Sequence, residues 1–164
     1  MSDTLVKGYE LHEEIGVGGW GAVHRASQSV VGREVAIKII KPEYANEPDF
    51  IRRFEAEAQL VARLESPYVV PLIDFWRDQQ GAFLVMRWLG GGSLLDRLQS
   101  QGALSLEEAV MVINNITKAL HVAHRNQVIH RDIKPGNILL DEDDYAYLTD
   151  FGIELIQTNL PKDA

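Results

Sequence analysis

The sequence contains no cysteine among its 164 residues. This excludes disulfide bonds, thiolate nucleophiles, and zinc or iron–sulfur sites built on cysteine. Long apolar runs are also missing, because no stretch approaches the ~18 residues of a membrane-spanning helix. The first ten residues lack the apolar core of a secretory signal. We therefore expect a cytoplasmic protein, or a cytoplasmic part of one.

Positive charge is scarce as well: 16 Lys and Arg stand against 24 Asp and Glu, which gives a formal charge of −8. Binding to nucleic acid or to an anionic membrane needs clustered basic residues, so neither is expected as a partner. What the chain does have is an ordinary apolar content of 46%. That content supports a packed core, and the length fits one domain at most.

The first half of the chain is typical of strands joined by short turns, with β-branched residues and glycine clusters in alternation. Five strands are expected at 9–16, 22–29, 34–40, 69–76 and 82–86. A loop is expected at 42–48 and a helix at 49–64. The apolar stripe of this helix is predicted to consist of Phe50, Phe54, Ala58, Val61 and Leu64.

The second half is predicted to be mainly helical, after a flexible junction at Gly90–Gly92. Ser93 is predicted to be an N-cap with an acidic residue three positions on, and Ser105 with Glu108 has the pattern of a capping box. The helix that Ser105 opens is expected to end near Asn126. Its apolar side is predicted to comprise Leu106, Ala109, Ile113, Ile116, Leu120 and Ala123. Short strands are expected at 138–140 and 146–149.

A glycine triplet, Gly16, Gly18 and Gly21, lies between the first two predicted strands. A dinucleotide loop would run directly into a helix, and a Walker A loop would continue with Lys and then Ser or Thr; neither follows here. A glycine-rich hairpin that covers nucleotide phosphates fits, with Val23 two residues past the last glycine. A plain flexible turn fits the triplet equally well.

Two charged residues of opposite sign lie in apolar surroundings. Lys38 is in the middle of the strand 34–40, and Glu57 is near the apolar side of the following helix. Either residue alone is usually solvated. Together they suggest an ion pair that could hold a triphosphate.

Polar chemistry is concentrated in the segment 130–137, which reads His-Arg-Asp-Ile-Lys-Pro-Gly-Asn. Its Pro and Gly indicate a loop. Asp132 is a carboxylate that can accept a hydroxyl proton, and Lys134 could stabilise a transferring phosphoryl group. Asn137 and Asp150, which begins Asp-Phe-Gly, carry the hard oxygen ligands that Mg²⁺ prefers.

These motifs occur in the order found in protein kinases, and the sequence resembles the eukaryotic-type kinase family, most of all its bacterial serine/threonine members. The resemblance covers residues 9–155 and implies an α+β fold: a five-stranded antiparallel N-lobe with one main helix, then part of a mostly helical C-lobe. It implies ATP and Mg²⁺ as cofactors, and protein substrates with Ser or Thr. Lys134 favours Ser/Thr over Tyr specificity.

The resemblance also implies a role for each matching residue. The glycine loop, with Trp20 at its tip, would cover the phosphates, and Glu57 would hold Lys38 against the α- and β-phosphates. Asp132 would orient or deprotonate the substrate hydroxyl, while Asn137 and Asp150 would hold Mg²⁺. The remaining nucleotide contacts would be Ile15, Val23, Ala36 and Leu139 around the adenine, Met86 behind it, and the backbone of Arg87, Trp88 and Leu89 along its edge. An apolar stack linking the lobes would consist of Val61, Leu72, His130 and Phe151.

The resemblance implies that residue 164 lies within the activation segment, before the substrate-docking part of the C-lobe. We expect an N-terminal tail at 1–8, the kinase N-lobe at 9–86, the hinge at 87–92 and a partial C-lobe at 93–164. Thr158 is a candidate phosphorylation site. An alternative function is an ATP-binding regulatory or pseudokinase-like fragment without transfer activity. Self-association, or further C-terminal domains in a longer protein, would cover apolar surface on the long helix.

Overall fold

The computed structural model describes residues 5–151. These divide into two compact units, and each is described by itself. The first comprises residues 5–58 and 72–88, and the second 59–71 and 89–151. No helix in the described part of the chain has the length and apolarity to cross a membrane.

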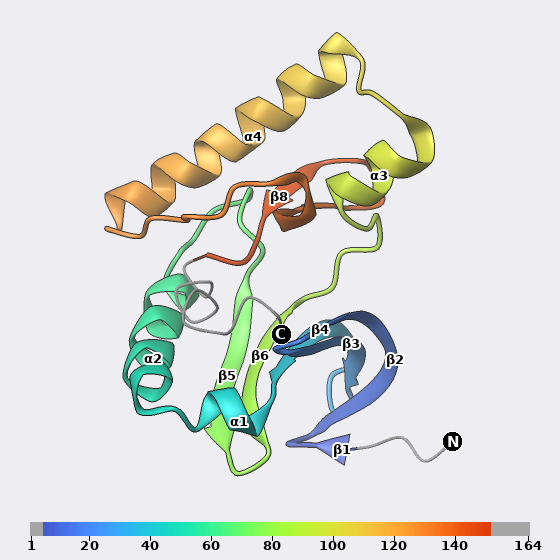
Figure 1. The fold of residues 1–164 in the computed structure, drawn as a ribbon. Helices are drawn as coiled ribbons and strands as arrows, with labels where there is room; N and C mark the ends of the chain where they lie inside the picture. Colours follow the sequence, from blue (N-terminus) through green and yellow to red (C-terminus); the bar gives the residue numbers. More distant parts are fainter. Residues whose placement is uncertain (1–4, 152–164) are drawn as a thin grey trace. The chain divides into compact units, whose positions relative to one another are not determined.

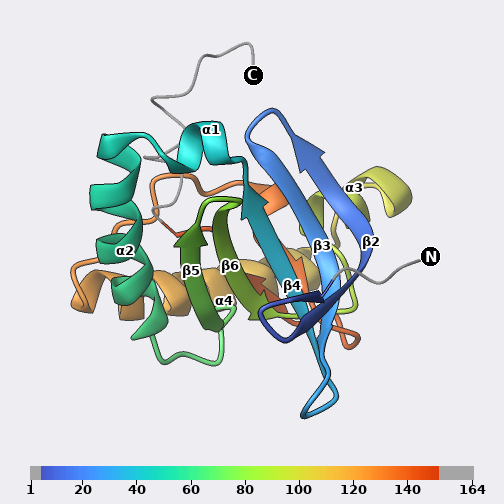
Figure 2. The ribbon, with the colours of Figure 1, turned by 90° about the horizontal axis from the view of Figure 1, so that it is seen from below.

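The first unit is built on a six-stranded sheet in the order β1-β2-β3-β4-β6-β5 (Figure 2). All of its pairings are antiparallel. The strands are β1 (Leu5–Val6), β2 (Tyr9–Gly18), β3 (Gly21–Gln28), β4 (Arg33–Ile40), β5 (Leu72–Asp78) and β6 (Gly81–Arg87). The five predicted strands are all present, and β1 is an additional edge strand that the sequence did not predict.

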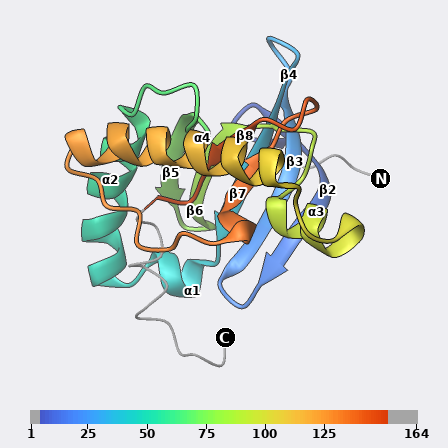
Figure 3. The same ribbon diagram turned by 90° about the horizontal axis from the view of Figure 1, so that it is seen from above.

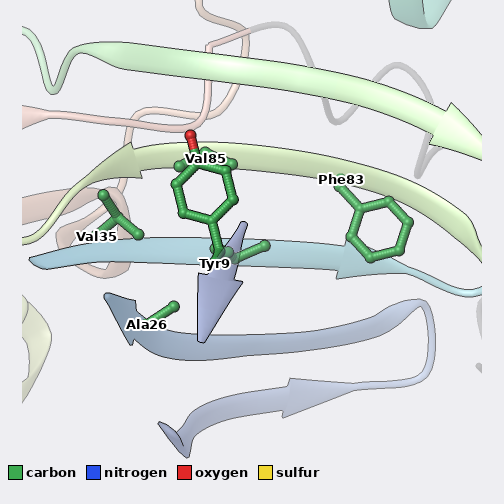
Figure 4. Close-up of a cluster of buried hydrophobic side chains, with 6 residues drawn as sticks. Tyr9, Ala26, Val35, Phe83 and Val85 are labelled. Carbon is green, nitrogen blue, oxygen red and sulfur yellow. The ribbon is translucent and has the colours of Figure 1, made fainter. Parts of the chain in front are cut away.

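One face of this sheet carries the core of the first unit. Successive side chains of a strand point to opposite faces of the sheet. The pairing of β4 with β6 therefore places Val35 and Ile37 on the same face as Phe83 and Val85. Figure 4 shows these side chains gathered with Tyr9 and Ala26. Burying such residues is worth about 1.5–3 kcal/mol for each large side chain, so the core fixes which face the other strand residues occupy.

Two helices accompany the sheet (Figure 1). α1 (Pro42–Ala45) was predicted to be a loop, but Pro42 at the first helical position starts a single turn. α2 (Pro48–Ala62) follows, and its last turn belongs to the second unit. All five residues of the predicted stripe are buried, although Leu64 lies beyond the end of α2 at Ala62.

The second unit contains the remaining elements. They are α3 (Leu94–Gln101), α4 (Leu106–Arg125), the 3₁₀ turn η1 (Pro135–Asn137), β7 (Ile138–Leu140) and β8 (Ala146–Leu148). The predicted N-cap at Ser93 and the predicted capping box at Ser105 are present, and Ser93 also forms a complete capping box with Asp96. The Ser105 N–H, together with Arg97, holds the pKa of Glu108 below its usual value.

Helix α4 packs against the β7–β8 hairpin (Figure 3). Its buried residues are Val112, Asn115, Ile116, Ala119 and Ala123. Of the predicted apolar side, Ile116 and Ala123 are buried, whereas Leu106 and Ile113 are 81% and 65% exposed. The helix carries apolar residues on two sides, and periodicity alone does not show which side is covered.

The three glycines after β6 were predicted to form a flexible junction, but the structure ties them to β7. Gly91 N–H donates to Leu140 O at 3.0 Å, and Leu140 N–H donates to Gly92 O at 2.8 Å. A Cβ at Gly91 would lie 2.3 Å from Asp141 O. Glycine is required there because two backbones approach closely.

Candidate functional site

Four of the predicted nucleotide-contact residues share one face of the sheet, opposite the core. Val23 pairs with Lys38 across β3 and β4, and Ala36 pairs with Met86 across β4 and β6. Directly paired residues of antiparallel strands point to the same side. Val23, Ala36, Lys38 and Met86 therefore form one continuous row on the sheet face opposite Val35, Ile37 and Val85.

The glycine loop is the tight turn that joins β2 to β3. Gly16 pairs with Val23 and Gly18 pairs with Gly21, so Gly19 and Trp20 form the tip. A Cβ at Gly21 would lie 1.9 Å from the carbonyl oxygen of Ile39, which permits no side chain. Ile15, just before the loop, is 45% exposed. The loop is thus a β-hairpin with narrow backbone spacing, and not the start of a helix.

Lys38 is buried, unlike an ordinary strand lysine, and only 4% of it is exposed. Its Nζ lies 4.4 Å from the centre of the Trp20 ring, within the range of a cation–π interaction. Glu57 is half-buried on α2, one turn after the fully buried Phe54. The edge-to-face contact of Phe54 with Phe75 of β5 anchors this part of α2 to the sheet.

The strand β6 ends in the residues expected to meet the adenine edge. Met86 is half-buried and Arg87 is exposed. The Trp88 ring lies 5.6 Å from the guanidinium of Arg25, whose side chain also pairs with Glu13 and Glu34. No sequence motif marks Arg25, because its position beside Trp88 depends on how the strands pair.

In the second unit, Asp132 is held by two side chains. Asn137 Nδ2 donates to the Asp132 carboxylate oxygen Oδ2 at 2.6 Å and to its backbone oxygen at 2.9 Å. Lys134 Nζ lies 2.8 Å from the same Oδ2. The three predicted catalytic-loop residues are therefore together, and the Asp132 carboxylate is held in position by Asn137 and Lys134.

His130 fixes the backbone around this carboxylate. Its Nε2 lies 2.6 Å from Thr149 O, and its Nδ1 accepts a hydrogen bond from the Asp132 N–H at 3.1 Å. These two partners require a neutral ring with the proton on Nε2. Burial lowers the pKa of His130 below its ordinary value of 6.5, although the Thr149 carbonyl opposes the shift. The ring also packs against Phe151 at 4.8 Å.

Two residues of this region adopt left-handed backbone conformations. Arg131 has a φ of 71° and Asp150 a φ of 60°. Such angles are uncommon for residues other than glycine and concentrate at functional sites. Leu139 lies in β7, half-buried, and forms an isolated bridge with Ser93. Leu89, also in the second unit, is buried.

The donor atoms are suited to Mg²⁺. Asn137 uses its amide nitrogen on Asp132, which leaves its amide oxygen as the atom able to meet a cation. The described residues contain no group of three or more His, Cys, Asp or Glu side chains that could hold a metal. A Mg²⁺ ion that keeps several waters and binds substrate phosphates needs only one or two protein ligands, so the chemistry fits. Gly152 and the candidate phosphorylation site Thr158 lie outside the described residues.

Comparisons with known proteins agree with this geometry. The protein kinase domain family model matches residues 9–161. PrkC of Bacillus subtilis, a serine/threonine-protein kinase, is 40% identical over 145 residues, which cover 88% of this chain and 22% of PrkC. PknH of Mycobacterium tuberculosis, also a serine/threonine-protein kinase, is 40% identical over 151 residues, covering 92% of this chain and 24% of PknH. The chain thus spans about a quarter of these relatives.

Solved structures extend the comparison to the fold. The Mycobacterium tuberculosis PknI kinase domain matches with a TM-score of 0.81 at 26% identity, covering 93% of this chain and 63% of that domain. Rad53 in complex with AMP-PNP matches with a TM-score of 0.80 at 29% identity, over 90% of this chain and 39% of that one. The family model covers most of the sequence, and its motif residues hold the arrangement described above. The chain belongs to the protein kinase family.

Proposed function

We propose that this chain is the ATP- and Mg²⁺-dependent part of a serine/threonine protein kinase. The observation that carries the proposal is the Asp132 carboxylate, oriented by Asn137 and paired with Lys134. Its relatives PrkC and PknH are named serine/threonine-protein kinases, and Rad53 was solved with the ATP analogue AMP-PNP. In this proposal, residues 9–86 form the N-lobe, 87–92 the hinge and 93–164 part of the C-lobe.

The residues of the first unit would bind the nucleotide. Val23 and Ala36 present small apolar side chains on one sheet face, suited to an adenine ring, with Met86 beside them and Ile15 at the rim. The loop glycines would bring backbone N–H groups close to the phosphates, and Lys38 would pair with the α- and β-phosphates. We propose that Glu57 orients Lys38, and that Arg87, Leu89 and Leu139 complete the adenine contacts.

The residues of the second unit would carry out the transfer. Asp132 would accept the proton of the substrate Ser or Thr hydroxyl. The hydroxyl oxygen would then bond to the γ-phosphorus as the bond from that phosphorus to the leaving ADP oxygen breaks. Lys134 would balance charge on the transferring group. Mg²⁺, held by Asn137 and Asp150, would neutralise the phosphate oxygens. The same assignment places the protein in the cytoplasm, which holds ATP and suits a chain without cysteine.

The decisive experiment measures transfer and binding separately. We expect the wild-type chain to move radiolabelled phosphate from Mg-ATP to casein, and Asp132→Asn to lower kcat at least ~100-fold while the Kd for ATP stays within about twofold. Asp143→Asn, in an exposed turn, is the matched control and should behave as wild type. ATP binding by the wild type without transfer would favour the alternative, a nucleotide-binding regulatory fragment.

We also propose self-association through the exposed side of α4. Leu106, Val110 and Ile113 are 81%, 58% and 65% exposed and are spaced four and three residues apart, so they lie on one side of the helix. Sedimentation should give a mass that rises with concentration, and Val110→Lys with Ile113→Lys should reduce it to that of a monomer. A wild-type chain that sediments as a monomer at every concentration would contradict this.

A further inference from the structure

The indole of Trp20 covers the ammonium of Lys38. The Lys38 Nζ lies 4.4 Å from the ring centre. The indole also fills the space next to Gly18, because a Cβ at Gly18 would lie only 2.8 Å from Trp20 Nε1. The side chain at the loop tip is therefore folded inward between Gly18 and Lys38, and Trp20 is half-buried although it sits at the end of a hairpin.

The surrounding backbone holds the tip in this position. Trp20 O accepts a hydrogen bond from Lys41 N–H at 2.9 Å, just past the end of β4. Gly18 and Gly21 pair across the hairpin, so the turn between them is as short as an antiparallel pair allows. Lys38 lies on β4 three residues before Lys41, and its pairing with Val23 directs it to the nucleotide face. The carbonyl anchor and the ring contact thus both fasten Trp20 to β4.

The contact offsets part of the cost of burying Lys38. An ammonium with 4% exposure has lost most of its water, and a charge in that position must gain other interactions. The face of a tryptophan ring is the most favourable aromatic partner for a cation, at about 0.5–2 kcal/mol. The ring over the Lys38 ammonium occupies one of the directions from which a phosphate oxygen could approach it.

We propose that Trp20 is a displaceable cap on Lys38, so that the phosphate chain of a nucleotide and the indole compete for the same ammonium. The inference rests on the proposed role of Lys38 in phosphate binding. Nucleotides must displace the ring, and their affinity is lowered by the cost of doing so. A ligand with the adenine and ribose but no phosphates has no need of Lys38 and avoids this cost. Trp20 therefore narrows the affinity difference between ATP and adenosine.

The binding test compares two ligands on three variants. Calorimetric titration of Mg-ATP should give a Kd about 2–30-fold lower for Trp20→Leu than for wild type, which is the cation–π energy converted to affinity. Trp20→Phe should fall between them, because phenylalanine is the weaker aromatic partner. Val17→Ala, at an exposed position of the same hairpin, is the matched control and should leave both affinities unchanged. The Kd for adenosine should stay within about twofold in every variant.

Three other results would contradict the proposal that Trp20 is a displaceable cap on Lys38. Weaker ATP binding by Trp20→Leu would make the indole a nucleotide contact instead of a competitor, and equal tightening for adenosine would make it a general obstruction. Unchanged ATP affinity would remove the competition altogether.

A second measurement needs no nucleotide. The emission of Trp20, taken as the difference between wild type and Trp20→Leu, should shift when Lys38 is replaced by Met, and the ring should become more accessible to acrylamide. An unchanged difference spectrum would contradict the contact. If the wild type bound neither ligand, the proposed function would fail, while this spectrum would still decide whether Trp20 covers Lys38.

Discussion

The two units position their candidate site residues by different means. In the first unit, Val23, Ala36, Lys38 and Met86 come to one face because antiparallel register sends alternate residues to opposite sides of the sheet. In the second unit, Asp132 is placed by side chains that bond to irregular backbone, including a histidine and an asparagine. Regular strand pairing places a whole row of side chains on one face, whereas a few individual hydrogen bonds orient the single carboxylate of Asp132.

This difference has an energetic consequence. A row set by register is supported by the whole sheet, so replacing one of its side chains leaves the others in place. An oriented carboxylate depends on a few donors, and removing one leaves a polar group without its partner at a cost of about 1–3 kcal/mol. Substitutions on this sheet face should therefore matter most where backbones meet, and substitutions in the loop around Asp132 should matter wherever a donor is lost.

The largest effect is expected where backbones meet, at Gly21. Gly21→Ala would place a Cβ 1.9 Å from Ile39 O and 2.9 Å from Ile39 C, so the hairpin must move away from β4. We expect a loss of about 3–4 kcal/mol in the free energy of unfolding, measured by urea denaturation. Gly16→Ala in the same hairpin meets its nearest atom at 3.9 Å and should change stability by less than about 1 kcal/mol. Equal stabilities for the two variants would show that the close approach of Gly21 to the Ile39 backbone does not hold the β2–β3 turn in place.

A smaller loss in the free energy of unfolding is expected when Asn137, the hydrogen-bond donor to Asp132, is replaced. Asn137→Asp keeps the size of the side chain but removes both hydrogen bonds to Asp132 and adds a second carboxylate beside it. We expect a loss of about 2–3 kcal/mol. The control Asn114→Asp makes the same chemical change at an exposed position of α4 and should stay within about 0.5 kcal/mol of wild type. If both variants matched wild type in urea, the hydrogen bonds would not be what places Asp132.

The smallest effect is a pH dependence of the second unit. Burial lowers the pKa of His130 in the folded state, so below pH 6.5 the unfolded chain binds the proton more readily than the folded one. The stability contributed by the neutral ring is complete above pH 6.5 and is lost as the pH falls toward the folded pKa. Unfolding measured from pH 8 to pH 5 should show this loss in wild type and less of it in His130→Gln. His121→Gln, an exposed histidine on α4, is the control, and a slope as steep in His130→Gln as in His121→Gln would contradict the assignment.

Much of this architecture could be predicted from the sequence, for reasons visible in particular residues. The spacing of Phe50, Phe54 and Ala58 gave both the helix α2 and its buried side. Strand β1 has only two residues and depends on long-range pairing with β2, so no local pattern reveals it. Helix α1 is a single turn that begins at Pro42, and the segment from Pro42 to Pro48 was predicted to be a loop. On α4, Asn115 is buried while Ile113 is exposed, which reverses what hydrophobicity predicts.

The site divides in the same way. Motif spacing identified Asp132, Lys134 and Asn137 together, and the structure brings them together. Their orientation could not be predicted, because it depends on backbone groups such as the Thr149 carbonyl that no side-chain pattern encodes. The inward fold of Trp20 was equally hidden. It follows from the tight pairing of Gly18 with Gly21 and from the hydrogen bond between Lys41 N–H and Trp20 O. Both are backbone interactions, and the residue types do not show where the Trp20 side chain will lie.

The imidazole of His130 has one further consequence. It connects Thr149 O, one residue before Asp150, to the N–H of Asp132 through a flat ring that contains no rotatable bond. The ring is therefore a rigid spacer, and its width sets the separation of the two chain segments that carry these carboxylates. A flexible side chain of similar length would let that separation vary, even if both hydrogen bonds were kept. Protonating the ring would remove the acceptor at Nδ1 and detach one end of the spacer, so acid would loosen the spacing of the segments before it unfolds the unit.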